Sequence, residues 1–186
     1  MRLEDQLARL AELGLPLAAG RTIDEMLISW PREEYEERPF DLVLFILGNQ
    51  VEAAPWGRRF CDRAWNFDTE CVHGPGIYVS IAEHLCRIAG QPEFADLRDH
   101  VDIDAQEAWI EYTVEGARRH WSIDVFDDWA DMMVVGYVMG DLEIAGKRFY
   151  RRDNGQAMTL FHLGDDTAEE INALAGAQVI APVLTL

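Results

Sequence analysis

The sequence predicts an α+β fold, with one domain over residues 1–186, an antiparallel sheet of about four to six strands, and helices packed on one face. Three features of the pattern support this prediction. Apolar residues recur at helical spacing over residues 1–50, which should be mainly helical. From residue 99 onward the spacing changes to strand-like alternation. Two polar turn sequences divide that region, so residues 99–186 should form a hairpin, a helix, a second hairpin and a helix.

The N-terminal third contains four expected helical segments. Leucines at positions 3, 7, 10 and 13 share one helical face that ends at Gly14. Thr22 followed by Glu25 matches a capping box, so a second helix should run to Trp30. The charged stretch REEYEE predicts one further turn, which ends before Pro39. The apolar run FDLVLFILG fits either a buried helix or a buried strand, and its helical neighbours favour the helix.

The middle of the chain should contain one strand-like segment and one helix. The aromatic-rich stretch WGRRFCDRAWNFD predicts a strand or an ordered irregular segment. In the next stretch, GPGIYVSIAEHLCRIAG, apolar residues at positions 77, 81, 85 and 88 form one helical stripe, and Gly90 suits the C-cap. The residues that follow, QPEFADL, are expected to be a connector.

The first predicted hairpin has an apolar face and a polar face. Ala108, Ile110 and Tyr112 share one parity and should face the core, whereas Glu107 and Glu111 should face solvent. Positions 121, 123 and 125 continue the apolar face in the second strand, after a turn near residues 115–117. This pattern is typical of a half-exposed antiparallel hairpin.

Four further elements complete the C-terminal half. A mostly apolar helix should begin near Asp128, within DDWADMMVVGYVMGDLEIAG. The stretch KRFYRRDNGQAMTLFHL predicts a second hairpin with Asn154 and Gly155 at its turn. Thr167 and Glu170 match a capping box and predict a last helix, and the apolar tail QVIAPVLTL should add a strand.

The charge of the chain limits its partners. Asp and Glu number 34 against 16 Lys and Arg, which gives a formal net charge of −18. Nucleic acids and anionic membranes are bound through basic groups, so neither is expected as a partner. A basic protein partner or a divalent cation is compatible with this charge, and so is a purely solubilising role.

Two features bear on the source and location of the protein. Lys147 is the only lysine and the other fifteen cations are arginines, which is typical of a GC-rich bacterial genome. The first residues, MRLEDQLARLAELG, lack the basic and then apolar pattern of a signal peptide. No apolar run approaches the roughly 20 residues that span a bilayer. A cytoplasmic bacterial protein is therefore expected.

Cysteine and histidine residues between positions 61 and 86 could supply a zinc site or a nucleophile. The candidates are Cys61, Cys71, His73, His84 and Cys86. On a helix, positions 84 and 86 point about 160° apart, so they cannot both face one metal. Cys71 and His73 precede a helix as a nucleophile and base would, but no third, orienting residue is evident. We therefore expect no metal, no cofactor and no catalytic residue, and only Cys71 and His73 merit a test for chemistry.

Ten carboxylates lie between residues 99 and 131, opposed only by Arg118 and Arg119. They are Asp99, Asp102, Asp104, Glu107, Glu111, Glu115, Asp124, Asp127, Asp128 and Asp131. They could form a solvated face, a cation site at positions 102 and 104 or at 127, 128 and 131, or a surface for a basic partner. Asp127 or Asp128 could also cap the following helix. The expected partner-binding residues, with the indole as an anchor, are Glu107, Glu111, Asp124, Asp127, Asp128, Trp129 and Asp131.

The sequence carries no diagnostic catalytic motif. It contains no GxGxxG, P-loop, GxSxG or HExxH pattern. We therefore expect a non-enzymatic acidic protein that binds a basic protein partner. One alternative is a metal-assisted hydrolase that uses the acidic or the Cys and His residues, and a second is a structural or assembly domain.

Residues 122–176 resemble a known group of proteins in their layout and charge. They contain SIDVFDDWADMMVVGYVMG and KRFYRRDNGQAMTLFHLGDDTAEEINALAG, in which a strand ends in paired acids before a tryptophan and a helix, a hairpin and an acidic helix follow. This stretch is similar to the small acidic α+β immunity proteins encoded beside bacterial polymorphic toxins. The resemblance implies an inhibitor that binds a toxin domain, often a basic nuclease, through complementary charge. It implies no particular residue, because immunity proteins share no fixed site.

Overall fold

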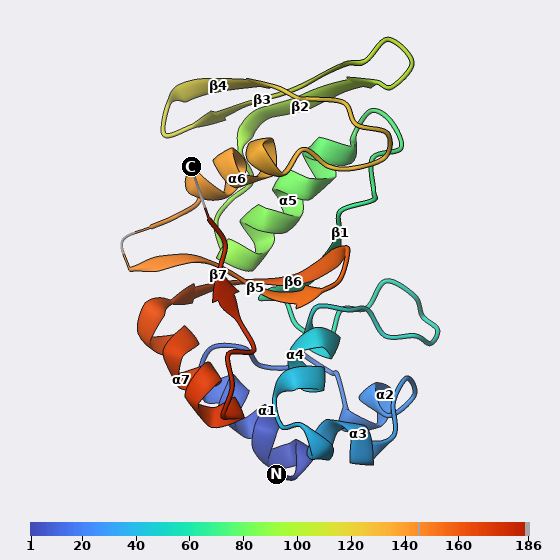
Figure 1. Cartoon of the computed structure of the whole chain (residues 1–186), viewed down its shortest axis with the longest axis vertical. Coiled ribbons are helices and arrows are strands. Elements are labelled where there is room, and N and C mark those ends of the chain that lie inside the picture. The colour runs from blue at the N-terminus through green and yellow to red at the C-terminus, as the bar shows by residue number, and fades with distance from the viewer. Residues whose placement is uncertain (145, 185–186) are drawn as a thin grey trace.

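A computed structural model of the chain describes residues 1–144 and 146–184, and over these residues it shows seven helices and two antiparallel sheets. The predicted α+β class is therefore confirmed, as is the helical character of residues 1–50. The molecule is elongated, and its helices and sheets are stacked in layers along the long axis (Figure 1). The strands divide between a four-stranded and a three-stranded sheet, whereas the sequence led us to expect one sheet.

The lowest layer in Figure 1 combines helices from both ends of the sequence. They are α1 (Leu3–Glu12), α2 (Ile23–Met26), α3 (Arg32–Glu37), α4 (Asp41–Leu47) and α7 (Asp165–Ala175). The ambiguous apolar run forms α4, as its neighbours favoured. The capping box of Thr22 and Glu25 is present, but α2 ends at Met26 rather than Trp30. Pro31 disfavours helical backbone at Trp30, so the chain turns before it reaches that residue.

The four-stranded sheet lies in the middle of the molecule and is buried on both faces. It contains β1 (Ala64–Asp68), β6 (Ala157–Gly164), β5 (Lys147–Asn154) and β7 (Ala181–Pro182), in that spatial order. Along β6, Met158 and Leu160 join the upper core, while Phe161 and Leu163 join the lower core beside the N-terminal helices. Helices therefore cover both faces of this sheet, not one face as expected, because β6 is apolar on both sides.

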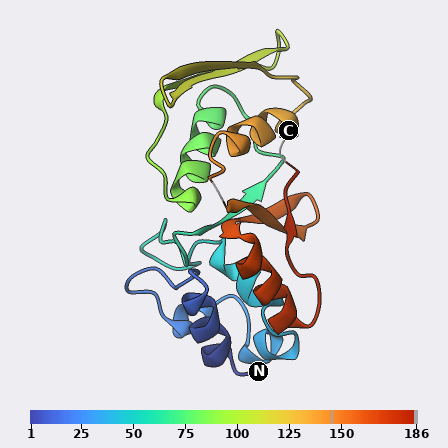
Figure 2. The same cartoon turned by 90° about the vertical axis from the view of Figure 1, so that its left-hand side faces the viewer.

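The upper layers consist of α5 (Ile77–Ala89) and α6 (Met132–Gly140), covered by a three-stranded sheet (Figures 1 and 2). This sheet contains β2 (Ala95–Asp102), β3 (Glu107–Val114) and β4 (Ala117–Ser122). The predicted faces of β3 are confirmed, since its even-numbered residues 108, 110 and 112 are buried. The stretch QPEFADL is not simply a connector, because β2 begins at Ala95. The charged residue Asp99 interrupts the apolar face of β2. The alternation of apolar and polar residues is therefore broken, and the sequence pattern does not predict this strand.

The start of α6 differs from the sequence-based expectation. The helix begins at Met132 rather than near Asp128, and its N-cap is Asp131. The Asp131 carboxylate accepts hydrogen bonds from the backbone N–H groups of Met133 (2.9 Å) and Val134 (3.3 Å). Neither Asp127 nor Asp128 caps the helix, because residues 123–130 form an ordered loop instead. Position 145, at the end of the predicted helical segment, lies outside the described residues.

The last helix and the turns show smaller differences. Helix α7 begins after Gly164 and has no side-chain cap, so the capping box expected at Thr167 is not formed. The first hairpin turns at residues 115 and 116, as expected. The second turns one residue later than predicted, because Asn154 still pairs with Ala157. The tail strand is confirmed as the short β7, and positions 185 and 186 of the predicted segment lie outside the described residues.

Candidate functional site: an acidic and aromatic loop

The structure gives internal roles to several acids of the 99–131 segment. Asp99 accepts hydrogen bonds from the backbone N–H groups of Gly76 (2.7 Å) and Tyr78 (2.9 Å), at the N-terminus of α5. Asp102 accepts one from the backbone N–H of Ala105 within the β2–β3 turn. Carboxylates satisfied in this way stabilise helix starts and turns. They are poor candidates for binding a partner or a cation.

Glu111 is also engaged within the protein. On the outer face of the three-stranded sheet it contacts Arg118 (2.8 Å), Arg98 (2.5 Å) and His120 (2.9 Å). Hydrogen bonds from Arg118, and then from Arg98, lower the pKa of Glu111 to about 2. Its charge is thus compensated by neighbours on the same sheet, and this face is a mixed surface rather than an acidic one.

The remaining expected residues gather in the loop between β4 and α6. We call residues 123–131 the acidic-aromatic loop. Phe126 and Trp129 form its tip, where the backbone N–H of Trp129 donates to the carbonyl of Phe126 at 3.1 Å. Asp127 lies inside this turn with a φ of 52°, in the left-handed region that Asp tolerates better than most residues. The tip is therefore a closed turn with a defined geometry.

Neighbouring segments hold the acidic-aromatic loop in place. The backbone N–H of Val72 donates to the carbonyl of Asp128 at 2.9 Å, and that of Ala130 donates to the carbonyl of Thr69 at 2.7 Å. The backbone N–H of Asp131 donates to the Tyr78 hydroxyl at 2.9 Å. These bonds tie the loop to the segment before α5 and to α5 itself. A loop fixed on both sides loses little conformational freedom when it binds a partner.

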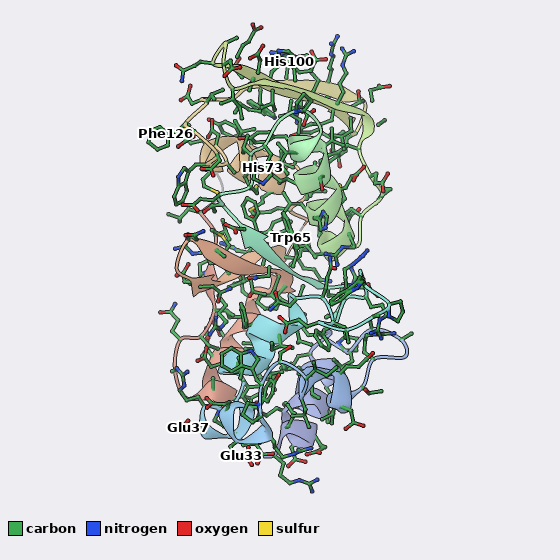
Figure 3. The ribbon with its side chains drawn as sticks, turned by 90° about the vertical axis from the view of Figure 1, so that its right-hand side faces the viewer. Glu33, Glu37, Trp65, His73, His100 and Phe126 are labelled. Atoms are coloured by element: carbon green, nitrogen blue, oxygen red, sulfur yellow. The ribbon has the colours of Figure 1, made fainter. Side chains whose placement is uncertain are left out.

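Two aromatic side chains of this loop are exposed to solvent. Phe126 is 74% exposed and Trp129 is 37% exposed. Phe126 projects from the edge of the molecule in Figure 3. Both side chains border a shallow pocket of about 460 Å³ that also includes Asp124, Ala130 and Asp131. Exposed Met132 and Met133 extend this apolar surface at the start of α6.

Acids of the same loop neighbour these aromatic residues in the chain. Within residues 1–144 and 146–184, the carboxylates of Asp124, Asp127 and Asp128 make no ion pair. Glu107 lies beside the loop, since the backbone N–H of Ile123 donates to the carbonyl of Ala108 at 3.0 Å. The arrangement can bind a ligand that carries both apolar groups and positive charge.

The structure brings together five of the seven residues expected to bind a partner. The loop contains Asp124, Asp127, Asp128, Trp129 and Asp131, of which Asp131 also caps α6. Glu107 adjoins the loop, and Glu111 lies apart on the outer sheet face. Phe126, the most exposed aromatic side chain of the loop, is not among the residues predicted from the sequence. Phe126 lies between acidic residues in a segment without helical or strand periodicity, and this pattern could have predicted an exposed aromatic side chain.

The cysteine and histidine candidates do not form one site. Cys61 is buried in the lower core and Cys86 in the upper core, so the four-stranded sheet separates them. His84 contacts the Ser80 carbonyl through Nδ1 (2.8 Å) and stacks on a tryptophan. In the described part of the chain, no three or more His, Cys, Asp or Glu side chains are grouped as metal ligands.

Cys71 and His73 also show no sign of activation. Burial, followed by the charges of Asp68 and Asp128, raises the pKa of the Cys71 thiol to about 11. A nucleophilic thiol requires the opposite shift. His73 is exposed on the segment that leads into α5 (Figure 3). The pair therefore fits an ordered loop better than a catalytic centre.

Comparison with known proteins identifies no family for this chain. A scan against protein-family models finds no match, and searches of curated proteins and of solved structures find no significant similarity. Among the described helices, none combines the length and the apolar character needed to cross a membrane.

Proposed function

We propose that this chain is a non-enzymatic bacterial binding protein of the immunity type, located in the cytoplasm, which inhibits a basic partner protein through the acidic-aromatic loop. One observation carries the proposal. Phe126 and Trp129 are held exposed on a fixed loop that also carries Asp124, Asp127 and Asp128, whose carboxylates make no ion pair within residues 1–144 and 146–184. The resemblance of residues 122–176 to immunity proteins supports a toxin domain as the partner.

The two kinds of side chain have different roles in this proposal. Buried aromatic anchors at the centre of an interface supply most of its affinity, and truncation of such an anchor costs about 2 kcal/mol or more. Acids at the rim mainly accelerate association with a basic partner by electrostatic steering, which can raise the rate by 10- to 1000-fold. The net charge of −18 strengthens this attraction at low salt.

The proposal predicts that a neighbouring gene encodes a basic toxin domain. The test immobilises that domain as the partner in a kinetic binding assay. Asp127→Lys combined with Asp128→Lys should reduce the association rate by about tenfold at low salt and weaken its salt dependence. Trp129→Ala should instead raise the dissociation rate by about tenfold or more, because it removes an anchor.

A matched control separates a local effect from the effect of total charge. Glu33→Lys combined with Glu37→Lys makes the same change in net charge on α3, at the opposite end of the molecule from the loop (Figure 3). The proposal requires this control to bind nearly as fast as the wild type. Equal slowing of both double variants would refute the loop as the binding surface, and so would unchanged binding of the Trp129 variant.

A further inference from the structure

The arginines that lack an acidic partner lie together at one place in the molecule. Twelve of the fifteen arginines form ion pairs with carboxylates. Over the described residues, the three arginines without such an ion pair are Arg59, Arg63 and Arg87. They lie at the joint between β1, the end of α5 and the segment before β1. In a chain with 34 acids, three arginines without an ion pair at one place make that place a candidate for binding an anion.

Over the described residues, the side chains of Arg63 and Arg87 contact backbone carbonyl groups rather than carboxylates. Arg87 donates to the carbonyl of Asp62 at 2.7 Å, and burial and then the charge of Arg59 lower its pKa to about 10. Arg63 reaches the carbonyl of Ile88 at 3.5 Å. The Nε of Arg59 is buried and has no hydrogen-bond partner among the described residues. A buried donor without a partner is costly, so a hydrogen-bond acceptor would stabilise the Arg59 guanidinium.

Arg59 lines a groove of about 550 Å³ that is rich in tryptophan. Trp56 is 74% exposed and Trp30 is 42% exposed along this groove. Trp65 forms part of the wall and stacks on His84, with ring centroids 4.6 Å apart and an interplanar angle of 28°. Figure 3 shows Trp65 at mid-height of the molecule, far from Phe126. The volume is in the range of small-molecule sites, and the indole faces can stack on a flat ring.

The loop that carries Trp56 is tied down. The backbone N–H of Val51 donates to the carbonyl of Arg58 at 2.7 Å. The Arg58 side chain donates to the carbonyls of Pro55 (2.6 Å) and Ala53 (2.9 Å) and pairs with Glu25 of α2. The groove is therefore bordered by an ordered loop, and a ligand would meet a site that is already formed.

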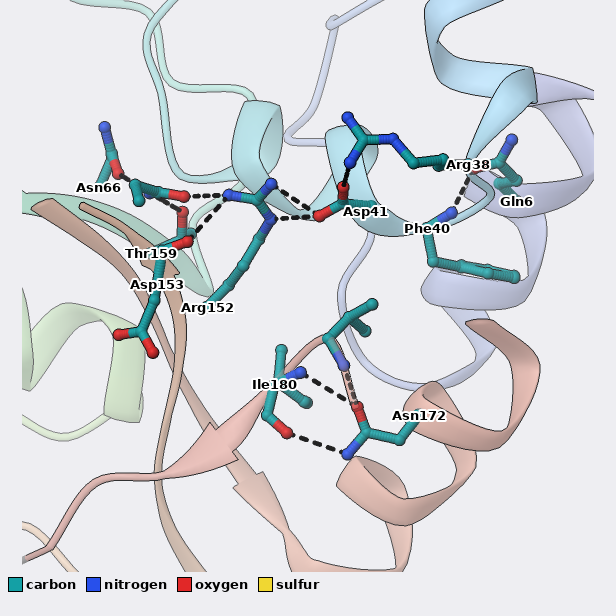
Figure 4. Close-up of polar contacts among 12 residues, drawn as sticks. Gln6, Arg38, Phe40, Asp41, Asn66, Arg152, Asp153, Thr159, Asn172 and Ile180 are labelled. Carbon is teal, nitrogen blue, oxygen red and sulfur yellow. Dashed lines mark hydrogen bonds and ion pairs between the residues drawn. The ribbon is translucent and has the colours of Figure 1, made fainter. Parts of the chain in front are cut away.

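Amide side chains along the groove add polar groups. Asn49, Gln50 and Asn66 line it together with Arg59. The Oδ1 of Asn66 accepts a hydrogen bond from Asn154 Nδ2 at 2.8 Å, which fixes the orientation of this amide (Figure 4). Amide side chains contain both donor and acceptor atoms, which can recognise the edge of a heterocyclic base.

We propose that this groove binds a nucleoside phosphate, with the base stacked on the tryptophans and the phosphate hydrogen-bonded to Arg59. Of the three arginines, Arg59 lines the groove, together with Glu52, which makes no ion pair with it among the described residues. A cationic ligand would be repelled by Arg59, and a neutral sugar would leave Arg59 without an anionic partner. An anion with a flat ring satisfies both the arginine and the indoles. The groove is separate from the acidic-aromatic loop, so this proposal stands independently of the proposed function.

Calorimetric titration of the whole protein with AMP, GMP, CMP and UMP tests the proposal. At least one of these nucleotides should bind in a saturable manner, and its affinity should exceed that of the matching nucleoside and of ribose 5-phosphate. Arg59→Gln should weaken nucleotide binding by about tenfold or more, because a charge-assisted hydrogen bond is lost. The same variant should leave nucleoside binding nearly unchanged. Trp56→Ala should weaken binding of both.

Two further variants serve as controls. Arg118→Gln removes an exposed arginine far from the groove and should leave nucleotide binding unchanged. Arg59→Lys keeps the charge and should retain part of the affinity, which distinguishes a lost contact from a folding defect. Absence of binding by all four nucleotides at millimolar concentration would refute the proposal. It would also be refuted if the nucleoside or ribose 5-phosphate bound as tightly as the nucleotide, or if Arg118→Gln weakened binding as much as Arg59→Gln.

Discussion

Replacement of Asp99 by alanine should destabilise the protein strongly, although Asp99 looks like one acid among ten in the sequence. From the inner face of β2 its carboxylate accepts hydrogen bonds from the backbone N–H groups of Gly76 (2.7 Å), Tyr78 (2.9 Å) and Val79 (3.2 Å). The N-cap residue of α5 is a glycine, which offers no side-chain acceptor of its own. Asp99 therefore caps α5 from a distant part of the chain and joins the three-stranded sheet to it.

The size of the effect follows from these contacts. Loss of a helix cap costs about 1 kcal/mol. A hydrogen bond to a charged group contributes about 1.5–3 kcal/mol, but Asp99 is half-buried and water would replace part of what is lost. We expect a total loss of about 2 kcal/mol. With a urea m-value of about 2 kcal/mol/M, the unfolding midpoint should fall by about 1 M. The melting temperature should fall by about 6 °C for a chain of this size.

Urea unfolding monitored by tryptophan fluorescence measures this loss of stability. Two other variants provide values for comparison. Asp99→Asn keeps one acceptor oxygen and should lose about half as much stability. Asp104→Ala removes an exposed acid of the same segment and should change stability by less than about 0.5 kcal/mol. If Asp99→Ala and Asp104→Ala unfold at the same urea concentration, the inferred capping role of Asp99 is wrong.

Two further predictions concern a buried histidine and a close backbone contact. Burial, and then the nearby charges of Lys147 and Arg63, lowers the pKa of His162 to about 4 from 6.5. The unfolded chain therefore takes up the proton more readily, so stability that is present above pH 6.5 is lost as the pH falls toward 4. The loss reaches about 2 kcal/mol at pH 5 in urea titrations. Gly48→Ala should cost about 1–3 kcal/mol in thermal unfolding, because a Cβ would lie 2.5 Å from Thr159 and 2.9 Å from the backbone nitrogen of Asn66.

Each of these predictions has a control in the same chain. His162→Leu should remove much of the acid destabilisation, and an unchanged pH profile in that variant would show that another group causes it. Gly136→Ala, in the middle of α6 with its nearest neighbour 3.8 Å away, should be neutral or stabilising by up to about 1 kcal/mol. Equal effects of the two glycine substitutions would contradict the close approach at Gly48.

Local patterns predicted many elements but not how the strands are shared between sheets. Apolar spacing identified α1 and α5, and parity identified the buried face of β3. The same patterns missed β2, because Asp99 occupies an inward position where an apolar residue was expected. They also favoured a single sheet, since pairing between β1 and β6 joins residues almost 100 positions apart, which no local pattern encodes.

The residues of the candidate site were also predicted only in part from the sequence. The sequence marked the acids and Trp129 of the loop, since composition and charge are visible without a fold. It could not separate Asp99, which caps a helix, from Asp127, which faces solvent, because both are aspartates in an acidic segment. It also missed Phe126, since exposure of an aromatic side chain in a loop depends on what packs around it.

The sequence by itself determined the α+β class, the net charge of −18 and the absence of known catalytic motifs, because these depend on composition and on short-range periodicity. Tertiary structure decided which charges remain free. It engaged Glu111 with two arginines. Among the described residues, it left Asp127 and Asp128 without an ion pair in a loop with two exposed aromatic side chains. It also placed Arg59, which has no carboxylate partner in the described part of the chain, in a tryptophan-lined groove. The physical reason is that burial and ion pairing depend on contacts between residues far apart in the chain.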